Sequence, residues 1–347
     1  MAPIPNARLL FNEIPTNFPE PGKTTVYDTS KTIDVEKEPL NGGILVKTLV
    51  LSADPYMRVQ MREAHIDGYM PPFIVGQPLY SLGVGKVLRS ENEAYKAGDY
   101  VYGVLEWALY SIPNTDTGGA FGTRLLKPEP GLPYSVYVGA AGMPGQTAYY
   151  GWKEFANAKA GDTVFVSGGA GPVGSLVVQL AKEDGLKVIA SAGSEAKVQF
   201  CKDVGADVTF NYKTVNTLDV LKKEGPLQLY WDNVAGSTLD AAIENADNHA
   251  RFIECGAISQ YNSKDGVNMK NLDQIYARRL TLYGFLVADL APKWQDEFYQ
   301  VIPKKLASGE FKYSEDLTRG LEKGCEALRD VQMGKNTGKS VIIVAEE

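Results

Sequence analysis

Residues 162–181 read DTVFVSGGAGPVGSLVVQLA, and this stretch decides the fold. Its first half is typical of a buried strand, and its second half repeats apolar residues with helical spacing. Gly169, Gly171 and Gly174 give a GxGxxG pattern between the two. Glycines let a backbone approach a pyrophosphate closely, and the helix N-terminus behind them offers unpaired N–H groups and a positive dipole end. This context predicts a dinucleotide-binding turn, with a tight turn that binds no ligand as the alternative.

Predicted strands and helices alternate on the C-terminal side of this turn. The stretch 186–193 is typical of a strand, and 194–205 is typical of a helix. Further strands are expected at 206–212, 227–235, 251–259, 280–287 and 338–347. Alternation of this kind predicts βαβ units that build a parallel sheet.

The part of the chain before the glycine turn has a different pattern. Short apolar runs at 43–52, 81–90 and 99–112 are separated by turn signals such as Asn41-Gly42-Gly43. Short β-rich runs with this spacing predict an antiparallel barrel or a sandwich-like domain.

Charge and cysteine content limit the partners of the protein. The 347-residue chain has a formal net charge of −7, which disfavours binding to nucleic acid or to an anionic membrane surface. We find neither a secretion signal nor an apolar run long enough to span a membrane. The three cysteines, Cys201, Cys255 and Cys325, are widely spaced and fit a reducing compartment better than a disulfide framework. We therefore expect a cytoplasmic protein that binds a small molecule.

The strand after the glycine turn indicates which dinucleotide binds. An NAD site usually has a carboxylate about 20 residues after the motif, where it bonds the ribose 2′-hydroxyl. Here the strand ends in small neutral residues, and Lys197, Tyr212 and Lys213 follow. Cations without a carboxylate suit a 2′-phosphate, so NADP(H) is the predicted cofactor, although Glu195 argues against it.

Several short strings, which keep their order along the chain, resemble the zinc-independent alkenal and enone reductases. These enzymes belong to the medium-chain dehydrogenase/reductase superfamily and include the prostaglandin reductases and the plant double-bond reductases. The strings are ADPYMR at 53–58, GMPGQTAYYG at 142–151, AGPVGS at 170–175, FNYK at 210–213, DNVAG at 232–236, CGAISQYN at 255–262 and GKNTGKSVI at 334–342.

The resemblance implies an α/β protein with two domains. A β-rich, chaperonin-10-like (GroES-like) substrate domain would comprise 1–131 with 309–347, and a Rossmann domain with a doubly wound parallel sheet would comprise 132–308. Zinc enzymes of the superfamily carry a GHE motif where this chain reads Gly76-Gln77-Pro78, so no metal is expected. Relatives in the superfamily are usually dimers, which implies a homodimer in which 280–287 lies near the contact.

The activity that the resemblance implies is the NADPH-dependent reduction of a C=C bond in an α,β-unsaturated aldehyde or ketone. Hydride would add at the β-carbon, and hydrogen-bond donors would stabilise the enolate oxygen without a metal. Tyr261 would lie beside the nicotinamide ribose and the substrate oxygen, and Tyr56 at the substrate pocket. The alternatives are an NADPH quinone reductase and a non-catalytic, crystallin-like NADPH-binding protein.

The glycine motif and the resemblance together give a set of cofactor contacts. The expected residues are Met143, Thr147, Gly169, Gly171, Pro172, Val173, Gly174, Lys197, Tyr212, Asn233, Cys255, Gly256, Ala257, Ile258, Tyr261, Phe285, Leu286, Val287, Asn336 and Lys339.

Overall fold

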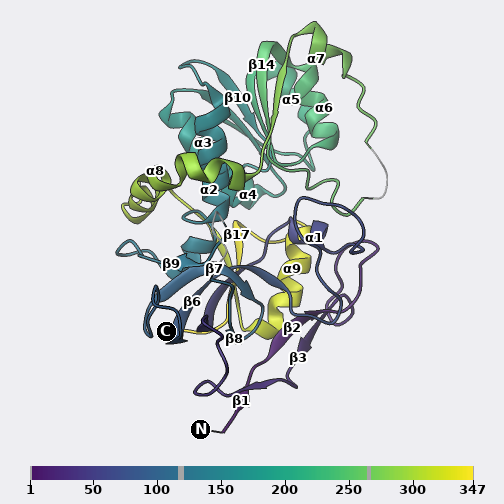
Figure 1. Cartoon of the computed structure of the whole chain (residues 1–347). Coiled ribbons are helices and arrows are strands. Elements are labelled where there is room, and N and C mark those ends of the chain that lie inside the picture. The colour runs from purple at the N-terminus through teal and green to yellow at the C-terminus, as the bar shows by residue number, and fades with distance from the viewer. Residues whose placement is uncertain (1, 116–120, 264–266, 347) are drawn as a thin grey trace. The chain divides into compact units, whose positions relative to one another are not determined.

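The computed structural model describes residues 2–115, 121–263 and 267–346 (Figure 1). The chain divides into two compact units. One comprises Met1–Met143 with Glu315–Glu347, and the other comprises Pro144–Ser314. Both boundaries fall later in the chain than the expected domain limits. The 3₁₀ helix η1 (Tyr134–Val138) explains the first difference, because it packs against strands of the first unit.

The Pro144–Ser314 unit contains a six-stranded parallel sheet. Its strands are β10 (Thr163–Val166), β11 (Lys187–Ala192), β12 (Val208–Asn211), β13 (Leu227–Asp232), β14 (Ala246–Glu254) and β15 (Thr281–Gly284). They lie in the order β12-β11-β10-β13-β14-β15, and every neighbouring pair is parallel. This is the Rossmann order, in which the chain reverses direction across the sheet beside β10. The predicted fold class is confirmed.

Helices lie before, between and after the strands of this sheet in the sequence, and several are labelled beside it in Figure 1. They are α2 (Met143–Gly151), the π-helix η2 (Trp152–Ala156), α3 (Pro172–Glu183), α4 (Glu195–Asp203), α5 (Thr217–Glu224), α6 (Gly236–Glu244), α7 (Asp273–Ala277) and α8 (Val287–Ala307). Local chemistry fixes where they begin. The side chain of Asn216, for example, caps α5 by accepting the N–H of Leu218 at 2.9 Å. Buried rings of Phe165, Tyr230 and Phe252 pack against one another in the core.

Four predicted strands are too long at their C-terminal ends by three or more residues, and the one predicted at 338–347 ends at Ile343. The strands predicted to reach residues 235 and 259 end at Asp232 and Glu254. The N–H groups of Cys255 and Gly256 both donate to the carbonyl of Asp232, which takes them out of the strand ladder. The third prediction, to residue 287, is wrong because Val287 begins α8. These corrections place residues 233–235, 255–259 and 285–286 in the segments that follow the carboxyl ends of the strands, and Val287 in α8.

The other unit is built around a sheet of the order β16-β17-β5-β6-β7-β9, with β8 also paired to β5. Its described elements are β1 (Ile4–Pro5), β2 (Arg8–Phe11), β3 (Thr25–Asp28), β4 (Thr32–Ile33), β5 (Ile44–Ser52), α1 (Met57–Gln60), β6 (Tyr80–Ser90), β7 (Tyr100–Glu106), β8 (Tyr110–Ser111), β9 (Arg124–Leu125), η1, β16 (Glu315–Arg319), the 3₁₀ helix η3 (Leu321–Lys323), α9 (Gly324–Gln332) and β17 (Lys339–Ile343).

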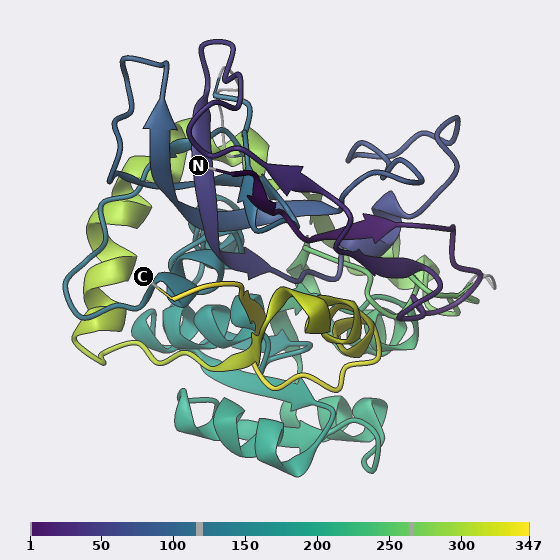
Figure 2. The same ribbon diagram turned by 90° about the horizontal axis from the view of Figure 1, so that it is seen from below.

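The C-terminal segment completes this second sheet. β17 pairs antiparallel with β5, so that Val341 lies opposite Ser52, and β16 pairs parallel with β17. α9 and β17 are the yellow helix and strand of Figure 2. Leu328 and Val331 of α9 reach the core that holds the buried Trp107. The sequence predicted the antiparallel character of this domain but did not predict β16.

Candidate active site

The turn between β10 and α3 is shaped by its glycines. A Cβ on Gly174 would lie 2.4 Å from the carbonyl oxygen of Gly168, so the fold itself requires glycine there. A Cβ on Gly171 would lie 3.4 Å from the same oxygen, which is an ordinary contact. Gly171 is the N-cap of α3 and has no side chain to bond the first N–H groups of the helix. This arrangement fits a pyrophosphate, which those N–H groups would bond.

The other predicted motif residues lie on the same turn. A Cβ on Gly169 would meet the Cβ of Ala190 at 2.9 Å and the Sγ of Cys201 at 3.2 Å. Gly169 therefore serves the packing of the turn against β11 and α4. Pro172 and Val173 begin α3 and are half-buried, and Pro172 contributes no N–H there.

The predicted 2′-phosphate residues lie at the ends of β11 and β12. The hydroxyl oxygen of Tyr212 would be 2.8 Å from a Cβ on Gly193, so this ring lies directly against the turn that follows β11. Lys197 lies half-buried in the first turn of α4. Glu195, the carboxylate that argues for NAD, accepts a hydrogen bond from Nδ2 of Asn211 at 2.8 Å. That bond directs Glu195 to a protein partner and supports the choice of NADP(H).

Asn233 joins the turn after β13 to the glycine turn. Its backbone N–H donates to Oγ of Ser167 at 3.0 Å, and its Nδ2 donates to the carbonyl of Ser167 at 2.7 Å. The N–H of Ile258 donates to the carbonyl of Asn233 at 3.3 Å. The turns after β10, β13 and β14 are therefore held together at one edge of the sheet, where dinucleotides bind in this fold.

Tyr261 lies in the segment after β14. Its hydroxyl accepts the N–H of Ala257 at 3.3 Å and lies close to Gly256. Burial raises the pKa of Tyr261, with smaller contributions from Cys255 and Asp232. The hydroxyl therefore keeps its proton at neutral pH and can donate it in a hydrogen bond.

The segment between β15 and α8, with the first residue of α8, has side chains that differ in burial. The ring of Phe285 packs against Phe155 and Trp231, with centroids 5.7 Å and 6.0 Å apart. Leu286 is the exposed N-cap of α8, and Val287 is buried in its first turn. The resemblance implies that this segment would bind the cofactor largely through backbone groups, and that contact stays a prediction.

Met143 and Thr147 both lie half-buried on α2. The N–H of Met143 donates to the hydroxyl of Tyr102 at 3.2 Å. The division of the chain falls directly after Met143, so the two residues belong to different units.

Tyr56 belongs to the unit of the second sheet, where it precedes α1. Burial, followed by the charge of Asp54, raises its pKa well above the ordinary value. Its hydroxyl is therefore a neutral hydrogen-bond donor, and its predicted place at the substrate pocket stays a prediction.

Lys339 forms a buried ion pair in the same unit. Its Nζ lies 2.8 Å from Oδ1 of Asp54 and donates to the carbonyl of Ala53 at 2.7 Å. The two charged side chains are only 3% and 4% exposed. The structure thus gives Lys339 a protein partner beside the loop that carries Tyr56, and its predicted contact with a cofactor stays a prediction.

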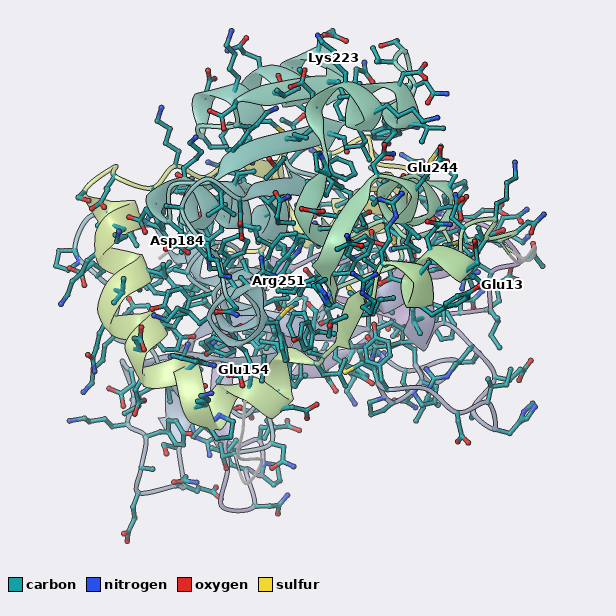
Figure 3. All side chains as sticks on the ribbon, turned by 90° about the horizontal axis from the view of Figure 1, so that it is seen from above. Glu13, Glu154, Asp184, Lys223, Glu244 and Arg251 are labelled. Carbon is teal, nitrogen blue, oxygen red and sulfur yellow. The ribbon has the colours of Figure 1, made fainter. Side chains whose placement is uncertain are left out.

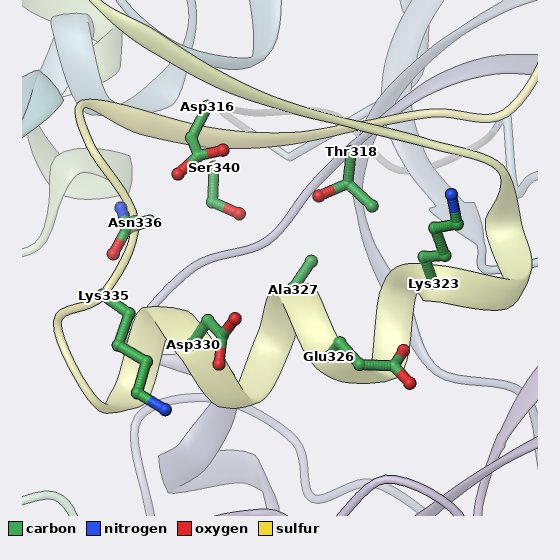
Figure 4. Close-up of a pocket in the computed structure, with 9 residues that line it drawn as sticks. All are labelled: Asp316, Thr318, Lys323, Glu326, Ala327, Asp330, Lys335, Asn336 and Ser340. Carbon is green, nitrogen blue, oxygen red and sulfur yellow. The ribbon is translucent and has the colours of Figure 1, made fainter.

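Asn336 donates through Nδ2 to the carbonyl of Gly338 at 2.7 Å. It also lines a pocket of about 440 Å³ between α9 and the strands β16 and β17 (Figure 4). The pocket is lined by Asp316, Thr318, Lys323, Glu326, Ala327, Asp330, Lys335, Asn336 and Ser340.

Sequence reasoning missed the carboxylates Asp54, Asp232 and Glu254. Asp54 and Asp232 stand inside the strings ADPYMR and DNVAG, and Glu254 ends an otherwise apolar strand. A carboxylate at the end of a buried strand is the signal that could have identified the last two.

Two findings concern metals and membranes. Within residues 2–115, 121–263 and 267–346, no group of three or more His, Cys, Asp or Glu side chains could hold a metal ion. In the same described ranges, no helix has the length and apolar character needed to cross a bilayer.

Comparison with known proteins identifies the class. Residues 172–306 match the family described as zinc-binding dehydrogenase, and residues 10–118 match the N-terminal domain of oxidoreductase. The NADP(+)-dependent 2-alkenal reductase of Nicotiana tabacum is 37% identical, over 99% of both chains. The chain belongs to the medium-chain dehydrogenase/reductase family and is an oxidoreductase.

Two further similar proteins indicate which group of oxidoreductases the chain resembles. Prostaglandin reductase 1 of Rattus norvegicus is 36% identical, over 88% of this chain and 91% of its own. The crystal structure of CurA from Vibrio vulnificus in complex with NADPH superposes with a TM-score of 0.87, at 30% identity, over 98% of this chain and 100% of that one. The predicted grouping with the alkenal and enone reductases is confirmed.

Proposed function

We propose that the protein reduces the C=C bond of α,β-unsaturated aldehydes and ketones with NADPH. The observation that carries this proposal is the position of Tyr261, a neutral donor held beside the turns that would bind the dinucleotide. The names of the tobacco and rat relatives and the NADPH bound to CurA support the substrate class and the cofactor.

Different residues of the candidate site would bind the pyrophosphate, the 2′-phosphate and the ribose of the cofactor. The glycine turn and the N-terminus of α3 would hold the pyrophosphate, and Lys197 with Tyr212 would hold the 2′-phosphate. Asn233 would lie near the adenine and ribose, and the backbone from Cys255 to Ile258 would line the cofactor site at the end of β14. NADPH, when bound, supplies a hydride.

Tyr261 would act on the substrate. As the β-carbon of the enone gains hydride, the C=C π bond breaks and negative charge collects on the carbonyl oxygen. A hydroxyl donor stabilises that charge more strongly than it stabilises the ground-state carbonyl, and this difference lowers the barrier. A proton from Tyr261 or from water then adds at the α-carbon to give the saturated carbonyl compound. Tyr56 is proposed as a second donor at the substrate pocket.

A substrate panel tests the proposal. NADPH absorbance is followed with an aliphatic enal, an aryl enone, a quinone and a saturated ketone, and NADH is run alongside. We expect turnover of the enal or the enone, with NADPH preferred over NADH. Turnover of the quinone alone would indicate a quinone reductase, and NADPH binding without any turnover would indicate a non-catalytic protein.

The role of Tyr261 has its own test. Tyr261→Phe removes one donor to the developing oxyanion, so kcat for an enal should fall roughly 100-fold while NADPH affinity changes little. Tyr276→Phe, at a tyrosine that is 77% exposed on α7, is the matched control and should behave as wild type. Unchanged kcat in the Tyr261→Phe variant would refute the assignment.

We also propose a homodimer and a cytoplasmic location. β15 is an edge strand of the parallel sheet, and its Leu282 is 38% exposed, which suits pairing with a second copy. A sedimentation mass of one chain would contradict this assembly. The three cysteines carry no disulfide, which agrees with a reducing compartment.

A further inference from the structure

Two buried carboxyl oxygens of the Pro144–Ser314 unit have no hydrogen-bond donor among the described residues. They are Oδ2 of Asp232, a residue without solvent exposure, and Oε1 of Glu254. Asp232 and Glu254 are the last residues of β13 and β14 and are direct partners in the parallel register. Register partners point to the same face of a sheet, and the two carboxyl groups lie within hydrogen-bonding reach.

The other carboxyl oxygen of Asp232, Oδ1, accepts four hydrogen bonds. Oδ1 accepts the N–H groups of Val234 and Ala235 and the hydroxyl of Tyr230, each at 2.7 Å, and Oγ of Ser167 at 3.2 Å. Ala235 has a φ of 62°, a conformation that residues other than glycine rarely adopt. Burial raises the pKa of Asp232, while the four donors to Oδ1 favour its ionised form and hold the turn after β13 in this shape.

A single proton satisfies both orphaned oxygens. Two carboxylates side by side in a buried site repel each other, so the second one holds its proton. Burial, and then the charge of Asp232, raise the pKa of Glu254 to about 8. At neutral pH the hydroxyl of a protonated Glu254 can donate to Oδ2 of Asp232, and neither group is left unpaired.

Asp232 and Glu254 end the two strands and directly precede two turns of the candidate active site. The turn after β13 and the turn after β14 are joined by the bond from Oγ of Ser259 to the carbonyl of Val234 at 2.6 Å. The N–H groups of Cys255 and Gly256 donate to the carbonyl of Asp232 at 2.9 Å and 3.0 Å. A change of charge at Glu254 therefore acts on both turns.

We propose that Glu254 is a positioning residue, which shares one proton with Asp232 and so holds turns 233–235 and 255–259 in the geometry that binds the cofactor. The inference rests on the proposed function for the assignment of these turns to the cofactor site. Glu254 touches neither substrate nor cofactor in this account.

The titratable groups around Glu254 are few. Asp232 and Tyr230 interact with it from β13, and Cys255 does so from the segment after β14. Tyr261, further along that segment, interacts with Cys255 and Asp232. Its partner in β15 is Gly284, which has no side chain. None of these groups is a cation, and no described lysine or arginine contributes to the pKa of Glu254. Of these five groups, Glu254 is the one that loses its proton first as the pH rises above neutrality.

The test is the pH dependence of NADPH binding, measured by fluorescence titration between pH 7 and pH 9. This range lies above the pKa of a phosphate monoester, so the 2′-phosphate keeps its charge. If the protonated pair is the binding-competent form, the apparent Kd of the wild type should rise about tenfold over this range, in step with the competent fraction. Glu254→Gln should remove the rise, since its amide donates to Asp232 at every pH and cannot ionise.

Two more variants complete the design. Glu254→Val, which leaves Oδ2 of Asp232 without a donor, should bind NADPH weakly at every pH, and its affinity should not respond to pH. Glu244→Gln, at a surface carboxylate labelled in Figure 3 that pairs with Lys222, removes one negative charge elsewhere in the unit and should keep the rise of the wild type.

An unchanged Kd across the range in the wild type, or an equal rise in Glu254→Gln, would overturn the proposal. These readouts need no enone. A protein that reduced no enone but showed the predicted pH dependence would contradict the proposed substrate and leave the role of Glu254 standing.

Discussion

Lys339→Met should lower the free energy of unfolding by about 3–5 kcal/mol, because it leaves the carboxylate of Asp54 buried and unpaired. The expectation follows from the 2.8 Å contact between Nζ and Oδ1 and from the near-complete burial of both side chains. The bond from Nζ to the carbonyl of Ala53 is lost as well. Urea unfolding, followed by circular dichroism, measures the effect.

The double variant Lys339→Met/Asp54→Asn separates the charge from the packing. It removes the uncompensated charge, so much of the lost stability should return. A loss below about 1 kcal/mol in Lys339→Met would mean that the pair behaves like an exposed one, which would contradict its burial.

Gly174→Ala should weaken both the fold and NADPH binding. The added Cβ would lie 2.4 Å from the carbonyl oxygen of Gly168. Because this oxygen is a backbone atom, the clash can be relieved only if the glycine turn moves. Overpacking of this kind costs about 1–3 kcal/mol of stability. A displaced turn should lose at least one hydrogen bond to the charged pyrophosphate, worth about 1.5–3 kcal/mol, so NADPH affinity should fall on the order of 10- to 100-fold. Thermal unfolding and NADPH titration measure the two effects.

Gly171→Ala is the matched variant. Its Cβ would have an ordinary 3.4 Å contact, so the protein should keep its stability to within about 1 kcal/mol. NADPH affinity should still fall roughly tenfold, because the methyl group stands where the backbone would approach the pyrophosphate. Wild-type affinity in Gly171→Ala would mean that the pyrophosphate does not bind at this turn.

The sequence predicted those parts of the fold that depend on local pattern. The strand, glycine turn and helix of residues 162–181 correspond to β10 and α3, because periodicity and turn chemistry are encoded within a few residues. β16 was missed because it pairs with β17 across an intervening helix, and pairing partners are not visible in a short window. The C-terminal ends of β13 and β14 depend on hydrogen bonds to Asp232 from another strand, so a pattern of apolar residues could not locate them.

The residues of the candidate site also fall into two groups: those that a local pattern or the resemblance predicts, and those that only the fold brings together. The glycines follow from a local motif and Tyr261 follows from the resemblance, whereas the hydrogen bond between the Ala257 N–H and the Tyr261 hydroxyl depends on the fold. The ion pair of Lys339 with Asp54 joins residues 285 positions apart, so only the fold brings them together. The pairing of Asp232 with Glu254 depends on the register of two strands, which the sequence does not specify.

The most direct test of the central claim is the position of the hydride in the product. NADPH that carries deuterium on the transferred position of nicotinamide C4 is turned over with an enal, and the product is analysed by mass spectrometry and NMR. The account predicts a saturated aldehyde with deuterium on the β-carbon and an intact carbonyl group. An allylic alcohol with deuterium on the former carbonyl carbon would contradict it.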